Sequence, residues 1–119
     1  PDNPASQSIY VTVLIGNDEE KKAREMFGDD PILFVNEQVI SVYASQEKYN
    51  KVIEIYKQLI AQNPNDIQIH ASLVATYMAN KQTYLALQEL RLIKDMFPDA
   101  KDQIDQFIKE IQGGRNPFQ

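Results

Sequence analysis

The sequence predicts an all-α fold in which helix-turn-helix repeats stack on one another and a C-terminal helix caps the stack. Apolar residues recur three, four and seven positions apart over most of the chain, as they do on a helix with one buried face. The same pattern returns after 34 residues with no insertion. The matched pairs are Val39 and Leu73, Tyr43 and Tyr77, Val52 and Ala86, Ile53 and Leu87, Tyr56 and Leu90, Leu59 and Ile93, and Pro64 and Pro98. A constant period of this length is typical of units that bury their apolar faces against the next unit.

Length, charge and composition favour one compact domain and argue against nucleic acid as a partner. The chain has 119 residues, 43% of them hydrophobic, and a formal net charge of -5 with a sequence pI near 4.8. It has no run of Lys or Arg that would form a surface for a phosphate backbone. The absence of cysteine excludes disulfides and thiolate metal sites but leaves the localisation undecided. The longest apolar run, residues 9–15, is far shorter than the roughly 20 residues that span a bilayer, so we expect no membrane insertion of this segment.

The first thirty residues are the least regular part of the sequence. Residues 1–8 are polar, contain two prolines and are expected to form a linker or arm. The β-branched residues of 9–15 favour a strand, but no second strand is visible to pair with them, so we expect a helix. Asp18 then offers a helix cap and Gly28 a stop, with a short helix between them. Residues 9–30 are therefore an N-terminal segment and a candidate degenerate repeat.

Residues 31–112 are predicted to form two helical hairpins and the capping helix. The expected helices cover about 31–45, 49–62, 67–80 and 83–97, and after Phe97-Pro98-Asp99 comes a last helix to about 112. The connection inside each hairpin is short and polar, so its two helices must run antiparallel. The last helix has one apolar and one charged face, which is typical of the end of a stack. Two glycines end it, and residues 113–119 are interpreted as a free tail.

This pattern resembles the tetratricopeptide repeat, a 34-residue helix-turn-helix unit with the spacing W-x2-L-G-x2-Y, A-x3-F, P. The matching residues form three series: Asn36-x2-Val39-Ile40-x2-Tyr43, Val52-x3-Tyr56, Pro64; His70-x2-Leu73-Val74-x2-Tyr77, Ala86-x3-Leu90, Pro98; and Ile104-x2-Phe107-Ile108-x2-Ile111. The chain departs from the family where Ile40 and Val74 stand in place of glycine and Val52 in place of alanine. Bulk at these points should push the paired helices slightly apart. We therefore expect a divergent form, and the resemblance implies a short right-handed superhelix.

The resemblance also implies a scaffold for protein–protein interaction. In this family the first helices of the hairpins line a concave groove that binds a segment of another protein. Mapped onto this chain, the groove residues are Phe34, Glu37, Ser41, Ala44, Gln68, Ala71, Ala75, Met78, Asp102, Asp105 and Lys109. Such a groove is small and mildly apolar in its middle and acidic near both ends. It suits a protein or peptide segment with small apolar side chains and some basic residues.

A carboxylate-binding groove and a purely structural role are the alternatives. Family members that bind a C-terminal carboxylate use Lys, Arg and Asn on this surface, and the corresponding residues here argue against that ligand. They are Glu37, Ser41, Ser72, Asp102 and Gln106. Because the chain begins with Pro1 and not Met, we expect a processed product or a piece of a longer protein. The alternative function is a structural or accessory domain of a larger protein, such as a membrane or envelope protein. It would pack against its own chain or self-associate, for example through residues 9–15.

No residue pattern indicates catalysis, a cofactor or a metal ion. The one histidine, His70, has no cysteine or second histidine beside it and stands where the family keeps a core aromatic residue, so we expect it packed in the core. Asp99, Asp102 and Asp105 recur at steps of three, whereas calcium loops place ligands at steps of two around a glycine, so we expect a solvated helix face. No glycine-rich phosphate loop or nucleophile elbow is visible, and we expect no enzymatic activity.

Overall fold

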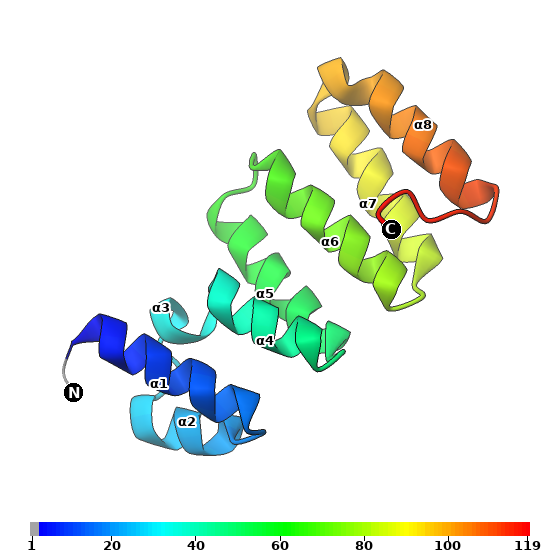
Figure 1. Ribbon diagram of the computed structural model, residues 1–119. Coiled ribbons are helices and arrows are strands. Elements are labelled where there is room, and N and C mark those ends of the chain that lie inside the picture. The colour runs from blue at the N-terminus through cyan, green and yellow to red at the C-terminus, as the bar shows by residue number, and fades with distance from the viewer. Residues whose placement is uncertain (1–2) are drawn as a thin grey trace. The chain divides into compact units, whose positions relative to one another are not determined.

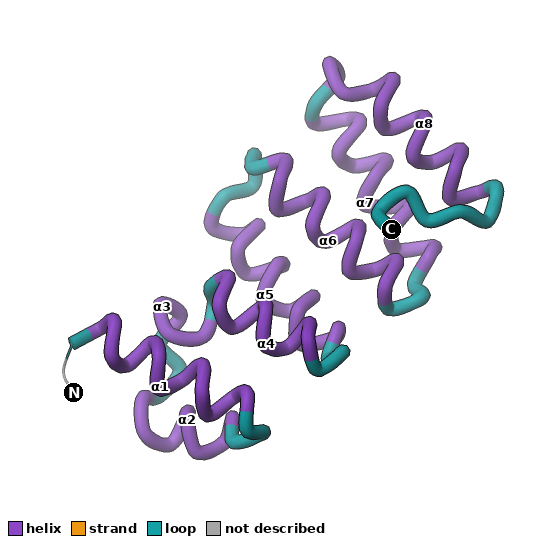
Figure 2. Tube along the Cα trace, in the orientation of Figure 1, coloured by secondary structure: helices purple, strands orange, loops and turns teal. Residues whose placement is uncertain are grey.

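The fold is all-α, as the sequence predicts. A computed structural model describes residues 3–119, and every regular element in this part of the chain is helical (Figure 1, Figure 2). Residues 1 and 2 of the predicted linker lie outside the described residues. The elements in order are α1 (Pro4–Gly16), α2 (Glu20–Phe27), α3 (Pro31–Phe34), α4 (Glu37–Ser45), α5 (Tyr49–Gln62), α6 (Ile67–Ala79), α7 (Thr83–Met96), the 3-10 helix η1 (Pro98–Ala100) and α8 (Lys101–Gln112).

The helices gather into two compact units, whereas the composition favoured one domain. Unit 1 ends at Ile55 and unit 2 is Tyr56–Gln119, so the boundary falls inside α5. In unit 1, α1 packs against α2, α3 and α4; in unit 2, α7 packs against both α6 and α8. Helical hairpins make most of their contacts with neighbours in the sequence, so no single core has to gather the whole chain. The predicted superhelix stays a prediction.

Three helical hairpins close with the same three-residue turn. The turns follow α1, α4 and α6, and their middle residues Asp18, Glu47 and Lys81 have φ angles of 61°, 57° and 59°. In each turn the next residue donates its N–H to a carbonyl five positions back, over 2.7, 2.9 and 2.8 Å. This ending satisfies carbonyl groups that the helix leaves free. The ends of α4 and α6, Ser45 and Ala79, are separated by the 34 residues of the sequence period.

Helix α1 begins earlier and α2 later than the sequence predicts. Residues 4–8, expected to be part of a linker or arm, form the first turns of α1, because the Asn3 side chain accepts a hydrogen bond from the Ala5 N–H at 2.8 Å and Pro4 suits the first helical position. The helix includes residues 9–15, which confirms the helix over the strand. Asp18 does not cap α2, because it is the left-handed middle residue of the turn after α1 and the N-cap of α2 is Glu19.

The helix predicted over 31–45 is divided by Asn36 into α3 and α4. The Asn36 carbonyl oxygen accepts a hydrogen bond from the Val39 N–H at 3.0 Å, and its amide nitrogen donates to the carbonyls of Ile32 at 3.0 Å and Leu33 at 3.1 Å. One side chain therefore ends α3 and caps the start of α4. Phe34 consequently lies on α3, where it is 3% exposed.

Unit 2 is built on an apolar seam between its helices, and its C-terminal residues join that packing. The buried side chains that α6, α7 and α8 contribute to the seam are Leu73, Val74, Tyr77, Ala86, Leu90, Ile93, Ile104 and Ile111. The tail expected to be free is packed, because the Phe118 ring lies 5.4 Å from the Phe107 ring of α8. Gly114 has a φ of 86°, and the Arg115 N–H after it donates to the Glu110 carbonyl, five positions back, at 3.0 Å. This is the turn that also ends α1, α4 and α6, and it reverses the direction of the chain after α8.

Candidate functional site

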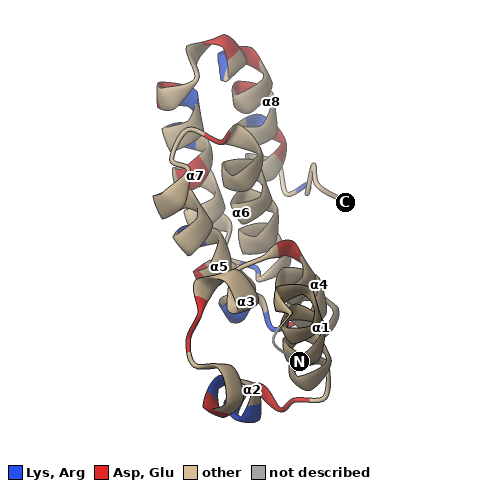
Figure 3. Cartoon of the chain, turned by 90° about the vertical axis from the view of Figure 1, so that its left-hand side faces the viewer, with Lys and Arg blue, Asp and Glu red and all other residues tan. Residues whose placement is uncertain are grey.

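Helix α6 presents a face without charge, which we call the α6 face and define by Gln68, Ala71, Ala75 and Met78. These predicted groove residues are three, four and three positions apart, so they share one side of the helix. Gln68 is exposed and the other three side chains are partly buried. The helix contains no Lys, Arg, Asp or Glu, and Figure 3 shows it without red or blue. The α6 face is therefore a mildly apolar surface with short side chains.

A cavity of about 150 Å³, which we call the α6–α8 cavity, adjoins this face. Most of its wall is apolar, and α6, α7, α8, η1 and the tail all contribute to it. The lining residues are Ile67, Gln68, Ala71, Leu90, Ile93, Ala100, Gln103, Ile104, Phe107 and Phe118. Two predicted groove residues, Gln68 and Ala71, are thus brought to one cavity.

The predicted groove residues of α8 lie away from the α6–α8 cavity. Asp102 and Lys109 are exposed, and the Asp105 carboxylate accepts a hydrogen bond from the Lys94 ammonium of α7 at 3.0 Å. Gln103 and Phe107 take their place at the cavity. Ile104 is buried, and Phe107, three positions later, lies on the same side of α8. The burial of Ile104 therefore turns Phe107 toward the cavity.

In unit 1 the predicted groove residues differ in burial. Phe34 is buried beneath Arg24, whose guanidinium carbon lies 4.3 Å from the centre of the ring. Glu37 and Ser41 are exposed on α4, and Ala44 is partly buried. A hollow in this unit lies along α1.

The exposed side of α1 is apolar. Ile9 is 67% exposed and Val13 is 54% exposed, while Val11, Leu14 and Ile15 are buried. A hollow of about 350 Å³ runs along this side, with small and apolar residues and one amide around it. Its lining is Ala5, Ser8, Ile9, Thr12, Val13 and Gln38. One side of residues 9–15 is therefore buried in unit 1, and the other side exposes apolar side chains to solvent.

His70 is packed inside unit 2, as predicted, and both of its ring nitrogens face acceptors. Nδ1 lies 2.5 Å from a Glu89 carboxylate oxygen of α7, and Nε2 lies 2.8 Å from the Pro64 carbonyl oxygen. A carbonyl and a carboxylate only accept, so both contacts are hydrogen bonds when both ring nitrogens carry hydrogen, as in an imidazolium paired with Glu89. Burial alone lowers the pKa of an imidazole, but the hydrogen bonds to Glu89 and Pro64 outweigh it and raise the pKa of His70.

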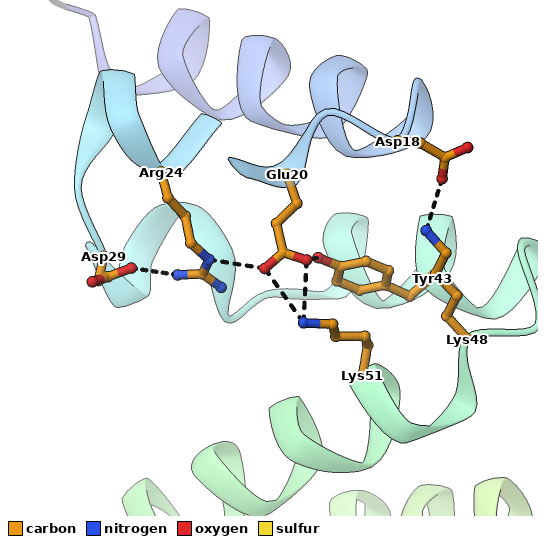
Figure 4. A network of polar contacts seen from close by, with 7 residues as sticks. All are labelled: Asp18, Glu20, Arg24, Asp29, Tyr43, Lys48 and Lys51. Carbon is orange, nitrogen blue, oxygen red and sulfur yellow. Dashed lines mark hydrogen bonds and ion pairs between the residues drawn. The ribbon is translucent and has the colours of Figure 1, made fainter. Parts of the chain in front are cut away.

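In unit 1 a polar network centred on Glu20 joins α2 to α4 and α5 (Figure 4). The Glu20 carboxylate accepts hydrogen bonds from the Tyr43 hydroxyl at 2.5 Å and from Arg24 Nε at 3.0 Å, and Lys51 Nζ lies 3.3 Å away. Burial raises the pKa of a carboxyl group, but the Tyr43 hydrogen bond, with Arg24 and Lys51, lowers the pKa of Glu20 to about 2. Burial and the hydrogen bond to Glu20 raise the pKa of Tyr43. Glu20 therefore stays ionised at neutral pH, and its contacts hold α2 against α4 and α5.

The described residues offer no cluster for a metal ion and no membrane-spanning helix. In residues 3–119 no group of three or more His, Cys, Asp or Glu side chains is placed to hold a metal ion. None of the helices described combines the length and the apolar character that crossing a bilayer requires.

Sequence reasoning missed the residues that contact across helices. Glu89 partners His70, and Phe107 and Phe118 line the α6–α8 cavity; the sequence pattern places Phe107 in the third repeat series but predicts no contact with another helix for Glu89 or Phe118. An aromatic residue in an otherwise polar tail was the one available signal for Phe118.

No family model, curated protein or solved structure matches this chain. The resemblance to the tetratricopeptide repeat therefore stays a prediction from the spacing of its residues.

Glu89→Gln is expected to destabilise the chain most at mildly acidic pH. The raised pKa of His70 means that the imidazolium stabilises the fold fully below about pH 6.5 and that this contribution is lost as the pH rises through the folded-state pKa. Removing the carboxylate should lower the free energy of unfolding by about 1.5–3 kcal/mol at pH 6, and by less at pH 9. Urea denaturation followed by circular dichroism measures both values. Asp95→Asn, on the exposed side of α7, is the matched control, and an equal loss at both pH values would contradict the charged pair.

Glu20→Gln is expected to destabilise unit 1 by about 1–2 kcal/mol at neutral pH, because it removes a charged acceptor from three donors. The folded-state pKa of Glu20 is lowered from 4.5 to about 2, so its stabilisation is complete above pH 4.5 and disappears as the pH falls toward 2. The difference between variant and wild type should shrink over that range in acid denaturation curves. Glu25→Gln, exposed on the same helix, should track the wild type. A constant difference down to pH 2 would speak against the network.

Proposed function

We propose that the chain is a protein-interaction module that binds a segment of a partner protein on the α6 face of unit 2. The observation that carries this proposal is the uncharged, partly exposed α6 face beside an apolar cavity. Apolar hollows with a few polar groups are the usual form of binding sites. The alanines of the face are short enough for a partner backbone to lie close to the helix. The Gln68 and Gln103 amides at the cavity supply donors and acceptors for that backbone.

The expected partner segment is apolar where it meets the α6 face and basic in its flanks. A charged side chain placed against the α6 face would lose hydration without an opposite charge on that face. The chain as a whole carries a formal charge of -5, which attracts basic segments and speeds their encounter. Asp102, exposed at the start of α8, is a candidate partner for one basic residue.

Self-association or packing within a larger protein is a second function that a specific observation favours. The side chains of Ile9 and Val13 project from α1, a helix without a charged residue, along a hollow of about 350 Å³. Uncharged apolar helix faces can pack against the same face of a second copy, because a two-fold interface needs a surface complementary to itself. This function uses residues of unit 1 alone.

Ala75→Arg is expected to abolish partner binding at the α6 face, because it places a long charged side chain in the middle of a mildly apolar surface. The full chain serves as bait for affinity capture, and the amount of each bound protein is measured by mass spectrometry. Partner recovery should fall at least about tenfold, which corresponds to about 1.4 kcal/mol. Gln88→Arg, which adds the same charge to an exposed position of α7, should leave recovery unchanged. Equal recovery with both variants would remove the α6 face as the binding surface.

A further inference from the structure

The C-terminal residues lie over the α6–α8 cavity in the manner of a bound peptide. The Phe118 ring packs on Phe107 with its centre 5.4 Å away and also lines the cavity, where Gln68 and Ala71 of the α6 face form part of the wall. The Phe118 N–H donates to the Asn116 side chain at 2.9 Å, which folds the segment into a local turn. The C-terminal segment, residues 113–119, thus places the Phe118 side chain against the proposed binding surface.

Phe118 does not fill the space that it covers. A volume of about 150 Å³ remains beside it, with Leu90, Ile93 and Ile104 buried in its wall. An apolar cavity of about this size and lining in another protein binds benzene. The residues that line the cavity include no charged side chain, and its polar groups are the amides of Gln68 and Gln103. The cavity therefore fits an uncharged ring or a branched aliphatic side chain.

We propose that the α6–α8 cavity binds a phenylalanine-sized side chain from an extended segment of the partner, and that Phe118 of the chain competes with it. This inference rests on the proposed function and names the chemistry of its site. The partner segment presents one aromatic residue to the cavity while the Gln68 and Gln103 amides bond to its backbone. The tail covers the same surface in the free chain and Phe118 forms one side of the cavity, so a partner segment that lies along this surface displaces the tail.

The contact between the tail and the α6–α8 cavity is of a kind that a partner can displace. Gly113 and Gly114 connect it to α8, and Phe118 is only partly buried. A tethered segment competes at a high effective concentration even when its own contacts are weak. The apparent dissociation constant of a partner rises in proportion as the fraction of tail-free molecules falls.

The test uses the full chain and a probe with the chemistry of the tail itself. The probe is the acetylated peptide Arg-Asn-Pro-Phe-Gln, added in trans to wild type and to Phe118→Ala, with methyl NMR shifts of Ala71 and Ile104 as the readout. Phe118→Ala should bind the probe at least about tenfold more tightly than wild type, because the competing side chain is gone. The same peptide with alanine in place of phenylalanine should not shift these methyl groups.

A second pair of variants tests the cavity without changing the tail. Ala71→Leu in the Phe118→Ala background puts a larger side chain into the cavity and should abolish probe binding. Ala79→Leu, an exposed position at the end of the same helix outside the cavity lining, should not. Circular dichroism of each variant checks that its helix content equals that of the wild type. Equal probe binding by wild type and Phe118→Ala, or by both leucine variants, would overturn the inference. The Ala75→Arg capture experiment remains a separate test of the proposed function, since it needs no aromatic probe.

Discussion

The orientation of α6 in unit 2 depends on the buried contacts of His70. The ring is 2% exposed and joins three segments, because it lies on α6, contacts Glu89 of α7 and reaches the carbonyl of Pro64 in the connection before α6. Removing one partner of a buried ion pair leaves an unpaired charge and costs more than the pair contributes as a whole. A rotation of α6 about its axis would break both contacts. The pair therefore favours one rotation of the helix, and that rotation turns the α6 face outward.

The backbone supports the same arrangement at the ends of the helices. Asp18, Glu47 and Lys81 adopt left-handed conformations that cost a non-glycine residue of the order of 1 kcal/mol. Each turn recovers this cost through hydrogen bonds to carbonyls that the helix would otherwise leave unpaired. The turns are three residues long, so the two helices of each hairpin lie close together and bury one apolar side. Side chains that such a hairpin leaves outside, like those of the α6 face, are available to a partner.

The helices and much of the core could be predicted from the sequence, whereas contacts between side chains far apart in the sequence could not. Periodicity located α5, α6, α7 and α8 to within a few residues, since an amphipathic helix repeats its apolar residues at a constant spacing. It did not reveal the break at Asn36, because that break depends on one amide bonding to two neighbouring carbonyls. The orientation of α8 and the packing of Phe118 depend on tertiary contacts, which no local pattern encodes. Of the predicted groove residues, Gln68 and Ala71 line the α6–α8 cavity, whereas Asp102 and Asp105 do not, and Gln103 and Phe107 line it from α8.

The most direct test of this account is the protonation state of His70 in the intact chain. Nitrogen-15 NMR of the imidazole ring distinguishes a doubly protonated ring from either neutral tautomer. The account predicts that both ring nitrogens carry hydrogen near pH 7, with slow exchange because the ring is buried between Glu89 and Pro64. A neutral ring with one bare nitrogen at that pH would contradict the ion pair and, with it, the reason that the α6 face is turned toward solvent.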